Sequence, residues 1–147
     1  MSFTIYFFKY NFKMLIISLY ILLEKKNHNI LKKIIWNIDN ENNILIIEIK
    51  SFQANSRLNA NTSHCIARSQ GYWDSYTGSD DLYNKQYYIY NWSLPANDRS
   101  SVIGITIEPK QRMRACHYKN DNPMSESEIK NYMKKLNIPY SILAPMT

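Results

Sequence analysis

Residues 101–118 have the sequence SVIGITIEPKQRMRACHY, and this stretch decides the fold. Isoleucines occupy positions 103, 105 and 107, and glycine, threonine and glutamate stand at 104, 106 and 108. A period of two residues is typical of a β-strand that turns one face to the core. Pro109-Lys110-Gln111 interrupts this pattern, and residues 112–118 follow as a second strand. The stretch therefore predicts an antiparallel β-hairpin.

The register of this hairpin decides which side chains face outward. If Glu108 pairs with Arg112, then Thr106 faces Arg114, and both arginines stand on the outer face of the sheet.

The same register assigns the two residues near the end of the hairpin. His117 lies on the isoleucine side opposite Ile103, and Cys116 lies beside Gly104. A shift of one residue reverses both assignments, because side chains alternate between the faces.

Further strands are predicted on both sides of a polar connection. Residues 43–50 are apolar and β-branched and predict a buried strand, and residues 86–92 predict an aromatic one. Residues 51–61 predict a connection with a helical turn at 54–58. Residues 64–68 predict a short strand, and residues 71–84 predict an aromatic, acidic loop.

Helices are expected at both ends of the chain. Apolar spacing over residues 16–35 fits one or two helices broken near 27–29, and residues 37–43 predict a turn. The apolar run 14–23 is shorter than a membrane span, so membrane association is not expected. Ser125 and Glu128 form a predicted capping box before an amphipathic helix that Pro139 ends.

These elements predict an α+β fold in a single domain spanning residues 1–147, in which N-terminal helices and a C-terminal helix pack on an antiparallel sheet. We expect a helical region at 1–42, the sheet at 43–118 and the C-terminal helix at 125–138.

Composition narrows the classes of function. The chain has 147 residues, a net charge of +6 and only 3 glycines. The charge favours polyanionic partners, and the glycine count argues against a phosphate-cradling loop, so no cofactor is expected. Two cysteines do not make a disulfide framework and indicate a reducing compartment, although a single Cys65–Cys116 bridge stays possible.

Both cysteines stand next to a histidine, in His64-Cys65 and Cys116-His117. Cys65 could be a thiol nucleophile with His117 or His64 as its base and Glu108 or Asp74 as the orienting carboxylate. The four residues could also be zinc ligands, but neighbours on a strand point to opposite faces, so no metal site is predicted. Buried structural cysteines are the third alternative.

Nucleic-acid or partner binding has its own candidate residues. Arginine side chains grip phosphates, and exposed aromatic rings stack on bases. The candidates are Arg68, Arg112, Arg114, Tyr88, Tyr90, Trp92 and Trp73.

A resemblance covers roughly residues 44–138. It rests on His64-Cys65, on Trp73 and Tyr76 with Gly78, on Tyr88-Ile89-Tyr90, on residues 101–108, on residues 114–117 and on Asn120-Asp121. This pattern resembles PcfJ-like proteins of conjugative plasmids and phages and a related phage domain. Many members carry Trp where this chain has His64. The resemblance implies an origin in a phage or mobile element and an α+β domain, without a named reaction.

The sequence predicts a non-enzymatic accessory protein that acts by binding, located in the cytoplasm of a host cell or on a virion. Nucleic acid is the expected ligand. Two alternatives stay open: a protein partner, as in virion assembly or inhibition of a host system, which the loop at 71–84 would contact, and a thiol-dependent hydrolase or transferase at Cys65.

Overall fold

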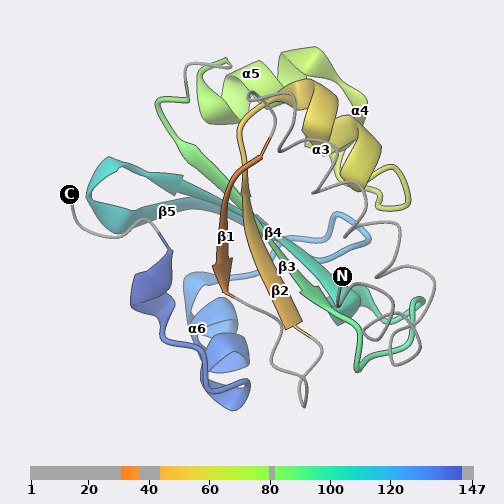
Figure 1. Cartoon of the computed structure of the whole chain (residues 1–147), viewed down its shortest axis with the longest axis vertical. Coiled ribbons are helices and arrows are strands. Elements are labelled where there is room, and N and C mark those ends of the chain that lie inside the picture. Colours follow the sequence, from red (N-terminus) through yellow and green to blue (C-terminus); the bar gives the residue numbers. More distant parts are fainter. Residues whose placement is uncertain (1–30, 37–43, 80–81, 144–147) are drawn as a thin grey trace, which may run out of the picture.

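The computed structural model describes residues 31–36, 44–79 and 82–143, the first of these ranges by its backbone. Its strands form one antiparallel sheet of five, in the order β1-β2-β3-β4-β5 (Figure 1). The strands are β1 (Leu31–Trp36), β2 (Ile44–Ile49), β3 (Lys85–Asn91), β4 (Val102–Glu108) and β5 (Arg112–His117). The helices are α3 (Phe52–Leu58), α4 (Cys65–Arg68), α5 (Gln70–Thr77) and α6 (Glu126–Lys135). The predicted α+β class is confirmed.

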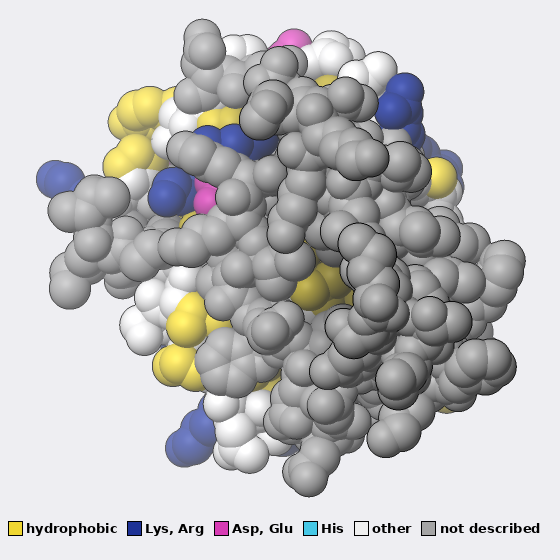
Figure 2. Space-filling view, in the orientation of Figure 1, with side chains coloured by type: hydrophobic (Ala, Val, Ile, Leu, Met, Phe, Trp, Pro, Cys, Tyr) yellow, Lys and Arg dark blue, Asp and Glu magenta, His cyan; other side chains and the backbone are white. Residues whose placement is uncertain are grey.

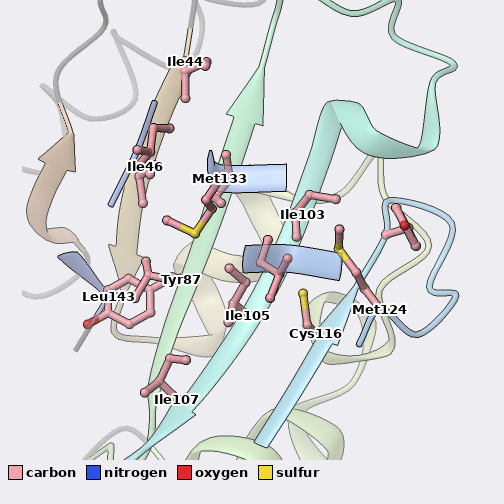
Figure 3. Packing of buried hydrophobic residues seen from close by; sticks show 14 residues of the cluster. Ile44, Ile46, Tyr87, Ile103, Ile105, Ile107, Cys116, Met124, Met133 and Leu143 are labelled. Carbon is pink, nitrogen blue, oxygen red and sulfur yellow. The ribbon is translucent and has the colours of Figure 1, made fainter. Parts of the chain in front are cut away.

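The sheet is covered on both faces (Figure 1). Alternate residues of the central strands pack against α6 on one side, where Ile103, Ile105 and Ile107 meet Ile129 and Met133 (Figure 3). The other set packs against α3, α4 and α5 and joins one cluster made by Leu45, Ile47, Ile49, Ala54, Leu58, Ile66, Trp73, Tyr88, Tyr90 and Val102. The expectation that one face of the sheet looks outward is therefore wrong.

The chain near the N-terminus differs from the prediction. Residues 31–36 form β1 and not the end of a helix, and β1 pairs with β2. The predicted helices at 16–30 and the turn at 37–43 lie outside the described residues. No helix in the described ranges has the length and apolarity needed to cross a bilayer.

Two segments in the middle are helical where other structure was expected. Residues 65–68 form α4 and not a strand, and the first half of the predicted loop at 71–84 belongs to α5. Trp73 and Thr77, four residues apart, are the buried residues of α5, which is the spacing of one helix face. The helix ends at Gly78, whose φ of 79° is left-handed and is accessible to glycine without steric cost.

The hairpin has the predicted pairing at its turn and a different one beyond it. Glu108 faces Arg112, as expected, but Thr106 faces Ala115 because the register shifts between Thr106 and Ile107. A residue inserted in one strand is a β-bulge, and it moves every later residue by one position.

The bulge decides the places of Cys116 and His117. Cys116 now faces Ile105 and is buried in the cluster under α6, whereas His117 faces Gly104. Both predicted assignments are reversed.

The C-terminal helix follows the prediction closely. Ser125 accepts a hydrogen bond from the backbone N–H of Glu128, and the Glu128 carboxylate accepts one from the N–H of Ser125. This capping box satisfies two donors that the first turn of a helix cannot pair internally.

Candidate binding groove along strand β5

An open groove of about 720 Å³ runs along β5, the edge strand of the sheet. Its walls come from α5, from Glu108 at the end of β4, from β5 itself and from Pro123 and Met124. Within the described residues, the outer side of β5 is paired only through the bridge of His117 with Pro123. The groove is therefore bounded by an edge that no described strand covers along residues 112–115.

Two arginines and one glutamate form the charged part of the groove. Glu108 lies 3.4 Å from Nε of Arg112 and 3.6 Å from Nη1 of Arg114. The Arg112 side chain is 81% exposed and that of Arg114 is 40% exposed. In Figure 2, dark blue Lys or Arg side chains lie next to a magenta acidic side chain near this end of the sheet. Because one carboxylate serves two guanidinium groups, the site carries an excess of positive charge.

Arg114 is held in place by α5. Its Nη2 donates a hydrogen bond of 3.2 Å to the carbonyl oxygen of Ser75, and its guanidinium lies 5.6 Å from the centre of the Tyr76 ring. Tyr72, one helical turn before Tyr76, is 56% exposed on the same wall of the groove. The groove thus combines oriented guanidinium groups with accessible aromatic rings.

A small pocket of about 10 Å³ adjoins the groove. Its lining brings the first Cys-His pair together with the histidine of the second, because His64, Cys65 and His117 meet there with Asp121 and Tyr76. Tyr76 and His117 line both the groove and the pocket. Their rings meet edge to face with centres 6.3 Å apart. A cavity of this volume holds about one water molecule or one hydroxyl group.

His64 is the most deeply buried ionisable group in this pocket, with 2% of its surface exposed. Its Nε2 donates a 2.6 Å hydrogen bond to the carbonyl oxygen of Tyr118. Its Nδ1 is then the acceptor nitrogen, and no described residue donates to it. Burial lowers the pKa of His64, so the imidazole is held neutral.

The Cys65 thiol is in the protonated form that does not attack. Burial raises the pKa of Cys65, and the neighbouring carboxylate of Asp121 raises it further. A nucleophilic cysteine needs the opposite environment, in which a cation favours the thiolate. The orienting carboxylates proposed from the sequence, Glu108 and Asp74, do not line the pocket.

Cys116 is separated from Cys65 by the sheet. It packs in the cluster under α6, where burial raises its pKa to about 12, whereas Cys65 packs against the cluster on the opposite face. Both cysteines are free thiols, so the 65–116 bridge is not formed. The described residues contain no group of three or more potential ligands arranged around a metal ion.

Most of the aromatic residues proposed for stacking are not accessible. Tyr88 and Trp73 are 0% exposed and Tyr90 is 3% exposed, so their proposed role as a stacking surface is wrong. Tyr90 donates a 2.7 Å hydrogen bond to the Asn59 side chain, and Trp92 stacks on Tyr90 as a half-buried ring. These rings belong to the core beneath α3, α4 and α5.

Of the predicted arginines, Arg112 and Arg114 line the groove and Arg68 does not. Arg68 is exposed and donates a 3.3 Å hydrogen bond to the carbonyl oxygen of Thr62. Tyr72 and Asp121 were not among the predicted site residues. The spacing of Tyr72 and Tyr76 is the helical signal that would have identified the wall of the groove, once residues 70–77 are recognised as a helix.

Comparison of the chain with family models, with curated proteins and with solved structures finds no match.

Proposed function

We propose that this protein is an accessory protein of a phage or mobile element and that the groove along β5 binds single-stranded nucleic acid. The observation that carries the proposal is the joint presence of Arg112, Arg114, Tyr72 and Tyr76 in one open groove. A guanidinium group can bind a phosphate through two parallel hydrogen bonds, and tyrosine rings stack on unpaired bases.

The charges support this ligand class. The net charge of +6 attracts polyanions at long range, and the exposed side chain of Arg112 is accessible to a phosphate. Arg114 is already oriented by Ser75 and Tyr76, so it loses little side-chain freedom on binding.

The edge of β5 argues against a peptide that adds as a further strand. The bulge at Arg114 interrupts the regular spacing of backbone donors and acceptors, and two exposed arginines stand on the strand. Bulges and charged residues are the devices by which edge strands avoid pairing with other chains. A ligand recognised by side chains suits the groove better than one recognised by the backbone.

The resemblance of residues 44–138 to PcfJ-like proteins supports the mobile-element part of the proposal. A conjugating plasmid passes through a single-stranded stage, which would give such a groove a ligand.

Fluorescence anisotropy with labelled 20-nucleotide DNA and RNA strands tests the proposal. We expect binding that weakens with salt, and a double variant Arg112→Ala/Arg114→Ala that binds more weakly. Its slope of log Kd against log salt should be smaller by about 1.4, since each lost phosphate contact on a single strand removes about 0.7.

The matched control is Lys134→Ala/Lys135→Ala, which removes the same charge from exposed positions of α6. Equal slopes for the two double variants would show that binding does not use the groove. Absence of salt-dependent binding to either strand would exclude the nucleic-acid function and leave a protein partner as the ligand of the groove.

A further inference from the structure

We propose that the protein cleaves RNA, with the ribose 2′-hydroxyl entering the small pocket and with Asp121 and His117 acting as base and acid. This inference rests on the proposed function, because the RNA strand must first lie in the groove. It adds a reaction and a choice between RNA and DNA.

The pocket has the size and the chemistry to receive a hydroxyl group. Its volume of about 10 Å³ admits one oxygen-sized group and not a base or a phosphate. His64 lines the pocket, and its Nδ1 is a buried acceptor to which no described residue donates. The 2′-hydroxyl is a group of this size that DNA lacks.

Asp121 is presented to the pocket by a tight turn that follows β5. Its N–H donates a 2.9 Å hydrogen bond to the carbonyl oxygen of Tyr118, and the N–H of Tyr118 donates one of 2.9 Å to the carbonyl oxygen of Asn122. Asp121 adopts a φ of 67°, in the left-handed region that aspartate and asparagine tolerate better than most residues. The turn keeps this carboxylate four residues from His117 along the chain and in the same pocket.

His117 stands where the groove and the pocket meet. Its ring packs edge to face on Tyr76, and the guanidinium of Arg114 lies over the same tyrosine ring. A phosphate bound by Arg114 in the groove is therefore next to His117, and the adjoining ribose is next to the pocket.

The reaction needs only the RNA and these side chains. The Asp121 carboxylate takes the proton of the 2′-hydroxyl, and the 2′-oxygen attacks the adjacent phosphorus and forms a P–O bond. The bond from phosphorus to the 5′-oxygen breaks, and the protonated His117 imidazole gives its proton to that oxygen. The products are a 2′,3′-cyclic phosphate and a free 5′-hydroxyl. Arg114 stabilises the negative charge that gathers on the phosphate oxygens.

The experiment uses the full chain and two 20-nucleotide strands, one of DNA and one of DNA with a single ribonucleotide, labelled at both ends. Binding is measured by anisotropy, and products are identified by mass spectrometry. We expect cleavage only after the ribonucleotide, with a 2′,3′-cyclic phosphate at the 3′ end of the upstream fragment, a 5′-hydroxyl on the downstream fragment, and the all-DNA strand bound and intact. His117→Gln and Asp121→Asn should each lower the rate about 100-fold or more, and Asp121→Asn, which changes no residue of the groove, should leave binding within about twofold.

Two features of the design control for misfolding and for a contaminating nuclease. Asparagine accepts the left-handed backbone of position 121, so Asp121→Asn keeps the turn. Lys134→Ala, purified in the same way, should cleave at the wild-type rate. Cleavage that persists in both His117→Gln and Asp121→Asn overturns the inference.

The two proposals fail in different ways. If both strands bind and neither is cut, the cleavage inference is wrong and the binding function stands. If neither strand binds and neither is cut, both proposals are wrong.

Discussion

The Nε2 of His64 donates a 2.6 Å hydrogen bond to the carbonyl oxygen of Tyr118, which lies 54 residues later in the chain. This bond ties the start of α4 to the residue that follows β5, at the edge of the sheet. The stability of this connection depends on the charge of one buried imidazole.

Acid should destabilise the fold through His64. Burial lowers its pKa below the ordinary value of 6.5, so below pH 6.5 His64 binds a proton in the unfolded chain but not in the folded chain. The free energy of unfolding should then fall with pH, from about pH 6.5 down to the lowered pKa, by at most about 1.4 kcal/mol per pH unit. Urea unfolding at pH 7.5 and 5.5 measures this, with His64→Gln as the variant that cannot titrate. The same loss of stability in both proteins would assign the effect to other groups.

Replacement of Gly104 by alanine should destabilise the protein by about 1–3 kcal/mol. A Cβ at this position would lie 3.2 Å from a ring carbon of Tyr88 and 3.3 Å from one of His64, and both rings are buried. Gly71→Ala is the matched control, because its Cβ would meet only the Ser69 hydroxyl at 3.7 Å on an exposed turn of α5. Thermal unfolding should show a lower Tm for the first variant and an equal or higher Tm for the second. Equal effects would mean that His64 and Tyr88 move apart freely.

The Cys65 thiol should react slowly with iodoacetamide at pH 7.5, more slowly than free cysteine. The reason is its raised pKa, which burial and Asp121 produce. Cys116 should stay unmodified in the folded protein, because it is 2% exposed and its pKa is raised to about 12. Both should react at the rate of free cysteine in urea. Mass spectrometry of tryptic peptides separates the two sites, and rapid labelling of Cys65 in the folded state would restore the thiol-nucleophile hypothesis.

Loss of the capping box should weaken α6. Ser125→Ala removes the acceptor that the N–H of Glu128 uses and should cost about 1 kcal/mol of unfolding free energy. Asn131→Ala, at an exposed position of the same helix, should cost nothing or stabilise slightly. Chemical denaturation of the two variants measures the difference, and equal stabilities would contradict the role of Ser125.

The strands β2, β3 and β4 and the helix α6 could be predicted because each carries a strong local signal. Isoleucines at every second position define one face of β4, and the Ser125–Glu128 pair marks the start of α6. These signals come from neighbours in the chain, and tertiary contacts reinforce them.

The prediction that the polar face of β4 looks outward was wrong, because polar side chains can be buried when they form hydrogen bonds with each other. Thr106 is 2% exposed and donates a 2.6 Å hydrogen bond to the side chain of Gln86 on β3, which is 0% exposed. The alternation of isoleucine with small and polar residues is therefore not an alternation of core and solvent here. The covering helices α4 and α5 were missed because four residues are too few to show a helical period, and aromatic residues are common in strands.

The candidate site could be predicted only in part. Arg112 and Arg114 were identified from their positions on β5, but the bulge near Arg114 depends on pairing with β4 and left no local signal. The meeting of His64 and Cys65 with His117 depends on contacts between the start of α4 and the end of β5, across more than fifty residues, and so no spacing rule could place Asp121 beside Cys65.

The rings of Tyr76 and His117 form a partition between two compartments, the wide groove along β5 and the narrow pocket that adjoins it. Any substitution at either ring alters the wide compartment and the narrow one in the same step. Substitutions meant to change which polymer binds should therefore be made first at Tyr72 and Arg112, which line only the wide compartment. Such substitutions leave the partition intact.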